Sequence, residues 1–307
     1  MITYIIRRLL QLIPVLFGVT LFVFLLMHLT PGNPAQIMAG ETAPPEVVER
    51  IEQRLGLNDP LPVQYGNFVK RIVQLDFGVS MRHNTPVIEE IKPRFWITLE
   101  LAVYSTLLSI FIGLIAGVVS AVRKYTWTDV TIMIVALFGL SMPNFWLGLM
   151  LMQWFSINLG WFPPTGWGSP AQGVLPVITL GTAGAAIIAR MTRSSMLEVL
   201  SQDYIRTARA KGVRERVIIY RHALKNALIP VVTVTGIQFG SLLSGTVLTE
   251  AVFAINGMGR YVIESIMVRD FPAVQASIII ISMVFVFVNL CVDITYRFLN
   301  KRIDLSE

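Results

Sequence analysis

Six long apolar stretches alternate with polar segments along the chain. Each stretch is long enough to cross the roughly 30 Å hydrocarbon core of a bilayer as a helix. The expected spans are residues 9–29, 98–122, 130–155, 174–196, 227–249 and 274–298. This pattern predicts an all-α, polytopic membrane protein with six transmembrane helices.

The distribution of positive charge predicts how these spans are oriented. If the N-terminus is cytoplasmic, 16 of the 25 Lys and Arg residues fall on the cytoplasmic side, as the positive-inside rule requires. Both termini are therefore expected in the cytoplasm. Arg7 and Arg8 precede the first span as they would in a secretory signal peptide. The apolar run that follows is too long for such a signal, so we expect it to be retained.

The largest outer segment, residues 31–94, carries the signs of two short helices. Residues 46–55 follow two prolines, start with acidic side chains and end at a glycine, as helices often do. Residues 63–75 place apolar side chains on one side at helical spacing, namely Tyr65, Phe68, Val69 and Ile72. The segment is interpreted either as a folded connector or as a docking surface for an external partner.

Polar side chains inside the apolar stretches are candidates for a transport pathway. Uncharged polar residues at membrane depth are rare and often functional, although each one alone could simply bond to a neighbouring helix. The candidate pathway-lining residues are Asn144, Gln153, Gln238, Ser241 and Asn289. Pro143 removes a helical hydrogen bond within the third stretch and predicts a bend there, either a hinge or a widened point.

Small residues in the spans predict close contact between helices. Gly113 and Gly117 lie in the second stretch, and Gly181 and Gly184 lie in the fourth. Residues of this size let two helix backbones approach closely. Tight bundling is therefore expected around the second and fourth spans, and also around the fifth, where the small residues are Gly236, Gly240, Ser241, Ser244 and Gly245.

Composition supports a membrane protein and argues against an enzyme. The chain is 54% hydrophobic and 14% charged, with a mean hydropathy of +0.65. Its net charge is +6, but the basic residues cluster beside the spans and not on a soluble domain, so nucleic-acid binding is not expected. The single cysteine, Cys291, excludes an internal disulfide. There is no P-loop and no zinc-protease or serine-hydrolase motif, so neither a catalytic site nor a metal or bound cofactor is expected.

A basic loop between the fourth and fifth spans carries a distinctive short helix. Residues 203–212 combine good helix formers with Asp203 as the expected N-cap and Gly212 at the end. A capped helix of this size could dock on a partner. The alternative is an ordinary basic loop that only fixes the orientation of the spans.

Residues 203–212, followed by residues 222–230, resemble the EAA region of permease subunits in binding-protein-dependent ABC importers. The resemblance is to the dipeptide, oligopeptide and nickel branch, which includes glutathione systems, and to its B-type permease. Similar segments extend over nearly the whole chain, at residues 7–10, 31–34, 55–57, 76–80, 189–196 and 269–272. The resemblance implies the type I ABC importer permease fold, with residues 1–94 as first helix plus outer segment and residues 95–300 as the transmembrane domain.

The resemblance also implies how such a chain works. A loop at about 197–226 would couple it to separate ATPase subunits, which would bind ATP and Mg²⁺. The coupling residues carried over are Asp203, Arg206, Thr207, Ala208, Arg209, Ala210, Lys211 and Gly212. The implied partners are a second, homologous permease, two ATPase subunits or domains and an extracytoplasmic substrate-binding protein, all at the cytoplasmic (inner) membrane. The implied cargo is a di- or oligopeptide, or a related small solute such as glutathione or a nickel chelate.

Two departures from the family pattern limit what the resemblance carries over. Thr207 stands where the pattern has alanine, and Lys225 where it has proline. Asn256 replaces a proline before a Gly-x-Gly turn. A self-contained secondary transporter or channel would work without an ATPase and would tolerate changes in residues 203–212. A scaffold protein would bind partners without moving a solute.

Overall fold

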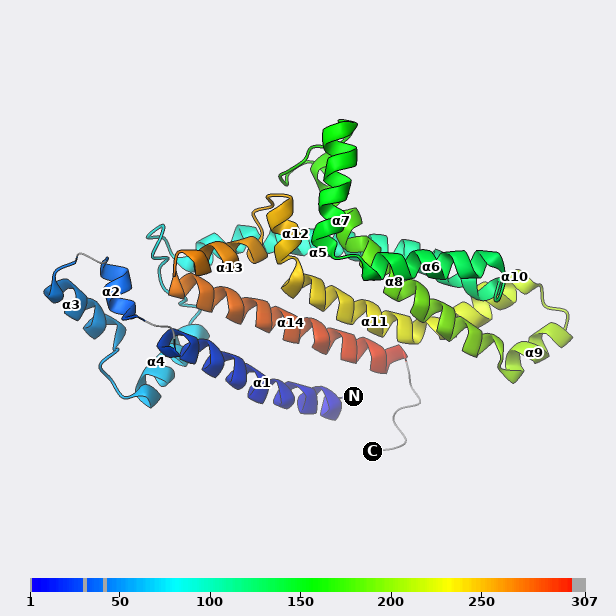
Figure 1. Cartoon of the computed structure of the whole chain (residues 1–307). Helices are drawn as coiled ribbons and strands as arrows, with labels where there is room; N and C mark the ends of the chain where they lie inside the picture. The colour runs from blue at the N-terminus through cyan, green and yellow to red at the C-terminus, as the bar shows by residue number, and fades with distance from the viewer. Residues whose placement is uncertain (1, 30–31, 41–42, 300–307) are drawn as a thin grey trace. The chain divides into compact units, whose positions relative to one another are not determined.

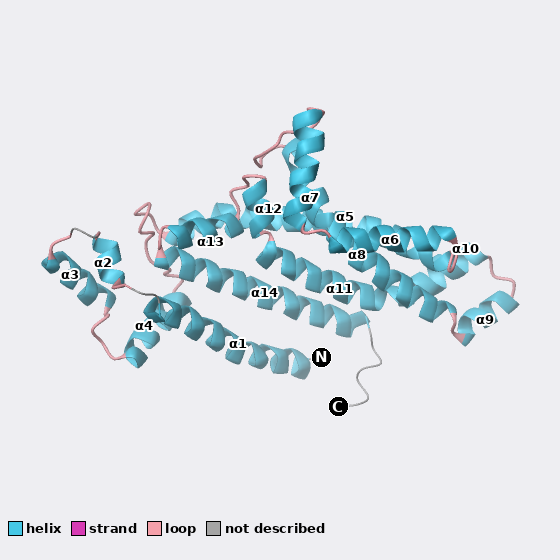
Figure 2. Cartoon of the chain, viewed as in Figure 1, coloured by secondary structure: helices cyan, strands magenta, loops and turns pink. Residues whose placement is uncertain are grey.

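The computed structural model describes residues 2–29, 32–40 and 43–299. Their regular structure is helical, apart from one isolated antiparallel bridge between Val79 and Pro86 (Figure 2). The all-α prediction is confirmed. Residue 300 of the expected transmembrane region, and Lys301 and Arg302 of the expected cytoplasmic tail, lie outside the described residues.

Helices follow one another along the chain, with longer connections at residues 74–86 and 159–169 (Figure 1). Two of the segments, η1 and η2, are π-helical. The bounds are α1 Ile2–Leu29, α2 Pro34–Ala39, α3 Pro45–Leu55, α4 Leu61–Val73, α5 Val87–Val122, α6 Trp127–Ser141, α7 Asn144–Leu151, η1 Met152–Asn158, α8 Pro170–Leu200, α9 Asp203–Ala210, α10 Glu215–Val217, η2 Ile218–Ala223, α11 Leu224–Gly245, α12 Val247–Val252, α13 Met258–Met267 and α14 Phe271–Leu299.

Five of the described helices are long and apolar enough to cross a membrane. The third predicted span is broken: α6 and the α7–η1 segment pass the same test together but are bent by 101° at residues 142–143. The predicted bend at Pro143 is confirmed. Pro143 has no backbone N–H to continue the ladder of α6 and serves instead as the N-cap residue of α7. With the bent pair counted as one span, the described residues hold six candidate spans, the number that the sequence predicts.

The chain forms two compact units. Unit 1 comprises residues 1–96 and 257–286, and unit 2 comprises residues 97–256 and 287–307. The outer segment therefore shares its unit with α13 and the first part of α14, which the sequence had grouped with the transmembrane domain.

The second predicted short helix, α4, packs at a core of unit 1. The apolar face of α4 packs through Phe68 and Ile72 against Phe24 of α1 and Ile279 of α14. The Tyr65 hydroxyl also lies 2.9 Å from the Thr20 hydroxyl. The apolar side of residues 63–75 is thus buried against α1 and α14.

Two of the family-like segments meet in unit 1. The Ser80 hydroxyl donates to the Asp270 carboxylate at 2.6 Å, and the same carboxylate accepts from the Ala273 N–H at the start of α14 at 3.2 Å. Asp270 is 2% exposed. These segments, 76–80 and 269–272, therefore have a structural role in joining the outer segment to a helix start.

Unit 2 is held together by close contact between α5 and α8. A side chain added at Gly117 would place its Cβ 2.5 Å from the Thr192 Cβ and 2.7 Å from the Ala189 carbonyl oxygen. At Gly184 the added atom would lie 2.4 Å from the Ser109 hydroxyl. The tight packing predicted from the glycines is confirmed, because nothing larger fits.

A carboxylate is fully buried on α12. Glu250 is 0% exposed, and its Oε1 accepts hydrogen bonds from the hydroxyls of Thr98 and Thr246 at 2.7 and 2.8 Å. Burial of a carboxyl group is tolerated only when it is hydrogen-bonded in this way. The group ties α12 to the start of the unit 2 portion of α5.

Candidate functional site

The predicted docking helix is α9, which lies between α8 and α10 at one end of unit 2 (Figure 1). We call it the coupling helix. Its Ile205 side chain is 0% exposed and belongs to a buried cluster that we call the coupling core. The coupling core consists of Val118, Ala121, Met196, Ile205, Ile218, Ile219, Ala223 and Ala227. One side chain thus anchors a short surface helix to α5, α8, η2 and α11.

The start of the coupling helix differs by one residue from the prediction. Gln202, not Asp203, is the N-cap residue, and no side chain caps the helix there. Asp203 is instead the first helical residue, where a carboxylate still favours the positive end of the helix dipole. Its carboxylate lies 3.6 Å from the Arg206 guanidinium, and both side chains are exposed.

The end of the coupling helix is a Schellman motif. Gly212 has φ +74°, and its N–H donates to the Arg209 carbonyl at 2.9 Å. The Val213 N–H donates to the Ala208 carbonyl at 3.2 Å. This pair of bonds requires a left-handed residue at Gly212. The predicted stop at Gly212 is confirmed.

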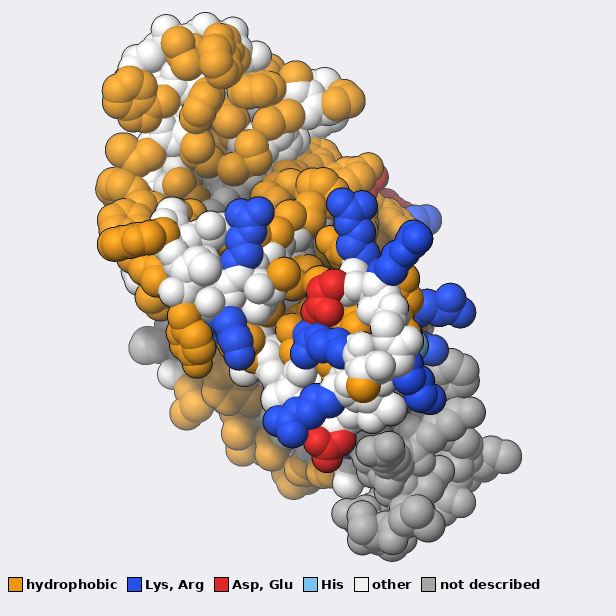
Figure 3. Space-filling view, turned by 90° about the vertical axis from the view of Figure 1, so that its right-hand side faces the viewer, with side chains coloured by type: hydrophobic (Ala, Val, Ile, Leu, Met, Phe, Trp, Pro, Cys, Tyr) orange, Lys and Arg blue, Asp and Glu red, His pale blue; other side chains and the backbone are white. Residues whose placement is uncertain are grey.

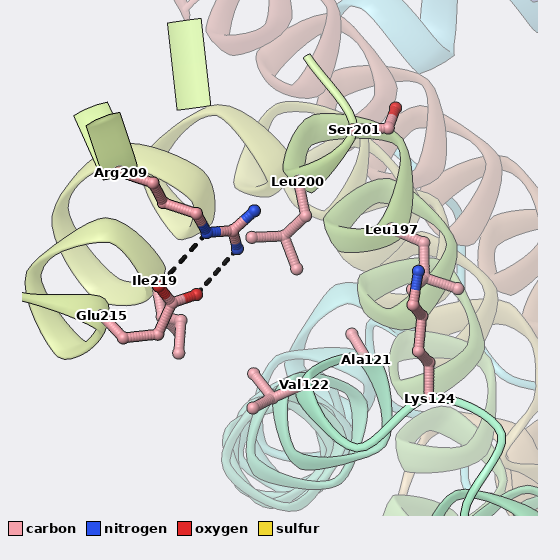
Figure 4. A pocket seen from close by; sticks show the side chains of 9 residues that line it. All are labelled: Ala121, Val122, Lys124, Leu197, Leu200, Ser201, Arg209, Glu215 and Ile219. Atoms are coloured by element: carbon pink, nitrogen blue, oxygen red, sulfur yellow. Dashed lines mark hydrogen bonds and ion pairs between the residues drawn. The ribbon is translucent and has the colours of Figure 1, made fainter. Parts of the chain in front are cut away.

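An ion pair fixes the turn that follows. Arg209 Nη2 and Nε donate to the two carboxylate oxygens of Glu215 at 2.7 and 3.2 Å. The hydrogen-bonded carboxylate raises the pKa of Arg209 above its ordinary value. This pair closes one side of a pocket of about 220 Å³ (Figure 4). The other lining residues are Ala121, Val122, Lys124, Leu197, Leu200, Ser201 and Ile219.

The coupling residues have two different environments. Ala208 is half-buried and packs against the coupling core. The other seven are exposed: Asp203, Arg206, Thr207, Arg209, Ala210, Lys211 and Gly212. Lys and Arg side chains gather on this end of unit 2 (Figure 3). The coupling helix therefore presents a basic outer face on an apolar support.

Three of the candidate pathway residues line one cavity. Asn144, Gln238 and Ser241 come from α7 and α11, and they border a space of about 300 Å³ that we call the polar cavity. The remaining lining residues are Thr106, Ser109, Leu180, Ala183, Gly184, Ile188, Thr235 and Leu242. None of these described lining residues is charged, so hydroxyl and amide groups supply the polarity.

Two candidates lie elsewhere. The Gln153 amide donates to Asn158 at 3.0 Å within η1, and its side chain is exposed. Asn289 is half-buried on α14 and does not line the polar cavity. Thr106, Ser109 and Thr235 were not among the predicted pathway residues, because hydroxyls in apolar helices usually bond to their own backbone. Thr235 does so, donating to the Val231 carbonyl at 2.8 Å.

Family models cover the chain in two adjoining parts. Residues 109–305 match the model described as "Binding-protein-dependent transport system inner membrane component". Residues 1–102 match the model of the N-terminal part of such membrane components. The chain belongs to this family. It is a permease of the ABC importer class, as the segments quoted above indicated.

Curated relatives match the permease from end to end. It is 47% identical to the dipeptide transport system permease protein DppB of Alkalihalophilus pseudofirmus, covering 99% of each chain. It is 46% identical to the glutathione transport system permease protein GsiC of Escherichia coli strain K12, again covering 99% of each. A solved structure of the MetNI methionine ABC transporter, inward facing, matches 70% of the permease and 98% of its own chain with a TM-score of 0.59. At 20% identity that likeness shows the fold alone.

Proposed function

We propose that this permease moves short peptides inward across the cytoplasmic membrane, with cytoplasmic termini and with ATP hydrolysis supplied by partner subunits. The observation that carries the proposal is the coupling helix. It is an exposed basic helix of defined length, anchored through Ile205 and closed by the Gly212 motif. Such a helix suits the cleft of an ATPase, which would contact Arg206 and Lys211 through acidic side chains or carbonyl oxygens.

The coupling core gives this helix a route to the transmembrane helices. Ile205 contacts a cluster to which α5 contributes Val118, α8 contributes Met196 and α11 contributes Ala227. Packed interiors move as units and are not deformed continuously. A displacement of the coupling helix by a closing ATPase dimer would therefore shift these helices together. This shift would switch the pathway between inward-open and outward-open states.

The polar cavity supports a peptide as cargo. Peptides carry backbone donors and acceptors, and the amides of Asn144 and Gln238 can serve either kind of group. The absence of charged residues among its described lining residues suits varied side chains. The names of the relatives point the same way, since dipeptides and glutathione share peptide bonds.

The complete importer would have further subunits. A second, homologous permease would form the other wall of the pathway, and two ATPase subunits or domains would bind ATP and Mg²⁺. An extracytoplasmic binding protein would deliver the peptide. Co-purification of the tagged chain from its native membrane tests this composition. Repeated recovery of the chain alone, with uptake that persists after ATP is depleted, would overturn the proposal.

A pair of glutamine variants tests the pathway. We expect Gln238→Leu to lower the uptake of a labelled dipeptide about tenfold, because it removes an amide from the polar cavity without changing its size much. Gln153→Leu is the matched control, since Gln153 bonds within η1. Equal uptake by the two variants would contradict the assignment of the polar cavity to the pathway.

A further inference from the structure

A partly buried ion pair lies near the coupling core in unit 2. Asp129, in the first turn of α6, is 3% exposed. Arg193 of α8 donates from Nε to one carboxylate oxygen at 2.7 Å and from Nη2 to the other at 2.6 Å. This two-point contact fixes both the distance and the orientation of the two helices.

The carboxylate of Asp129 has two more donors. The Ser120 hydroxyl of α5 donates to Oδ1, and the Tyr125 backbone N–H donates to Oδ2 at 3.0 Å. Tyr125 has φ +60°, a left-handed conformation that a tyrosine adopts only when its surroundings hold it. One side chain thus binds α5, the α5–α6 turn and α8 at the same level.

The residues that bond to Asp129 neighbour residues of the coupling core, to which the coupling helix is anchored. Ala121, one residue after Ser120, belongs to the coupling core, and so does Met196, three residues after Arg193. Ala121 and Lys124 also border the pocket closed by the Arg209–Glu215 pair (Figure 4). Any force on the coupling helix reaches α5 and α8 within one helical turn of the ion pair.

We propose that Asp129 and Arg193 are positioning residues that hold the ends of α5, α6 and α8 as one rigid block. The block turns as a unit when the coupling helix moves. Without the ion pair, the first turn of α6 separates from α8, and ATP is hydrolysed without a matching movement of cargo. This inference rests on the proposed function, because it requires an ATPase-driven displacement of the coupling helix.

The test compares two arginines of α8 in the complete importer reconstituted in vesicles. Arg193→Gln removes the ion pair, and Arg190→Gln removes an exposed charge three residues earlier. ATP hydrolysed per labelled dipeptide transported should rise on the order of tenfold in Arg193→Gln and stay at the wild-type value in Arg190→Gln. Arg193→Lys keeps the positive charge but loses the two-point contact of the guanidinium, so its ratio of ATP to dipeptide should lie between those of the two glutamine variants.

Hydrogen exchange of the same reconstituted importer gives a second readout. Peptides covering residues 123–130 should exchange faster in Arg193→Gln, since the Asp129 carboxylate that accepts from the Tyr125 N–H is no longer held in place by Arg193. The inference is overturned if the ratio of ATP to cargo matches that of Arg190→Gln, if exchange is unchanged, or if uptake falls only in proportion to a lower amount of assembled complex. Failure of the proposed function looks different, since wild type and Arg190→Gln would then both lack ATP-driven uptake.

Discussion

Substitution of Gly212 tests whether the end of the coupling helix has to be left-handed. A side chain added at Gly212 would meet nothing within 4 Å, so steric overlap within the chain contributes nothing to the effect. The effect comes from the backbone, because φ of Gly212 is +74°. An ordinary L-residue pays about 1–2 kcal/mol in this region, and a β-branched one is a strong outlier. A penalty of that size shifts the balance between the native turn and alternatives by a factor of about 5–30.

We therefore expect Gly212→Val to lower ATP-dependent uptake by about 5–30-fold while the amount of chain in the membrane is unchanged. Gly212→Asn is the matched control, since asparagine has a similar volume but tolerates the left-handed conformation. Its uptake should stay close to that of wild type. The assay is uptake of a labelled dipeptide, normalised to membrane content. Wild-type uptake by Gly212→Val would refute the reasoning, and equal losses in both variants would show that bulk at the partner surface matters and backbone geometry does not.

Three further predictions concern the support of the site. Ile205→Ala should cost about 2–5 kcal/mol of local packing and abolish ATP-dependent uptake, whereas Val217→Ala, at a 37% exposed side chain, should leave uptake unchanged. Gly117→Val should lower the melting temperature of the extracted chain, because its Cβ would lie 2.5 Å from a side-chain carbon of α8; Gly18→Val, with nothing within 4 Å, should not. Glu250→Ala should destabilise the chain by about 1–3 kcal/mol in thermal unfolding, and Glu250→Gln should cost less because it keeps an acceptor for both hydroxyls. In each pair the first variant should lose more uptake or stability than the second, and the opposite result would contradict the contact on which that prediction rests.

The apolar pattern predicted the spans because lipid solvation and helix length constrain them directly. The bend at Pro143 followed from a missing N–H, but its size of 101° depends on the packing of α7, which no local signal encodes. The end of the coupling helix was predicted correctly at Gly212, since only glycine adopts that conformation freely. Its start was placed one residue late, because Asp is favoured both as an N-cap and in the first turn.

Interactions between residues far apart in the chain could not be predicted from the sequence. Asp129 and Arg193 are 64 positions apart, and nothing in either segment names the other as its partner. Gln238 and Asn144 were found as polar residues in apolar stretches, but their common cavity depends on how α7 and α11 pack. The π-helical segments were also missed, since their residues have the same local preferences as those of an α-helix.

The break between α6 and α7 has a consequence for hydration. A continuous span satisfies its own backbone, whereas a break leaves carbonyl oxygens at the end of α6 without helical donors. Each such group costs several kcal/mol in hydrocarbon and is tolerated only beside protein or water. Asn144, the residue just after the break, borders the polar cavity. Water reaching that cavity would solvate the broken backbone, so a passing peptide would exchange one hydrated surface for another and avoid full desolvation.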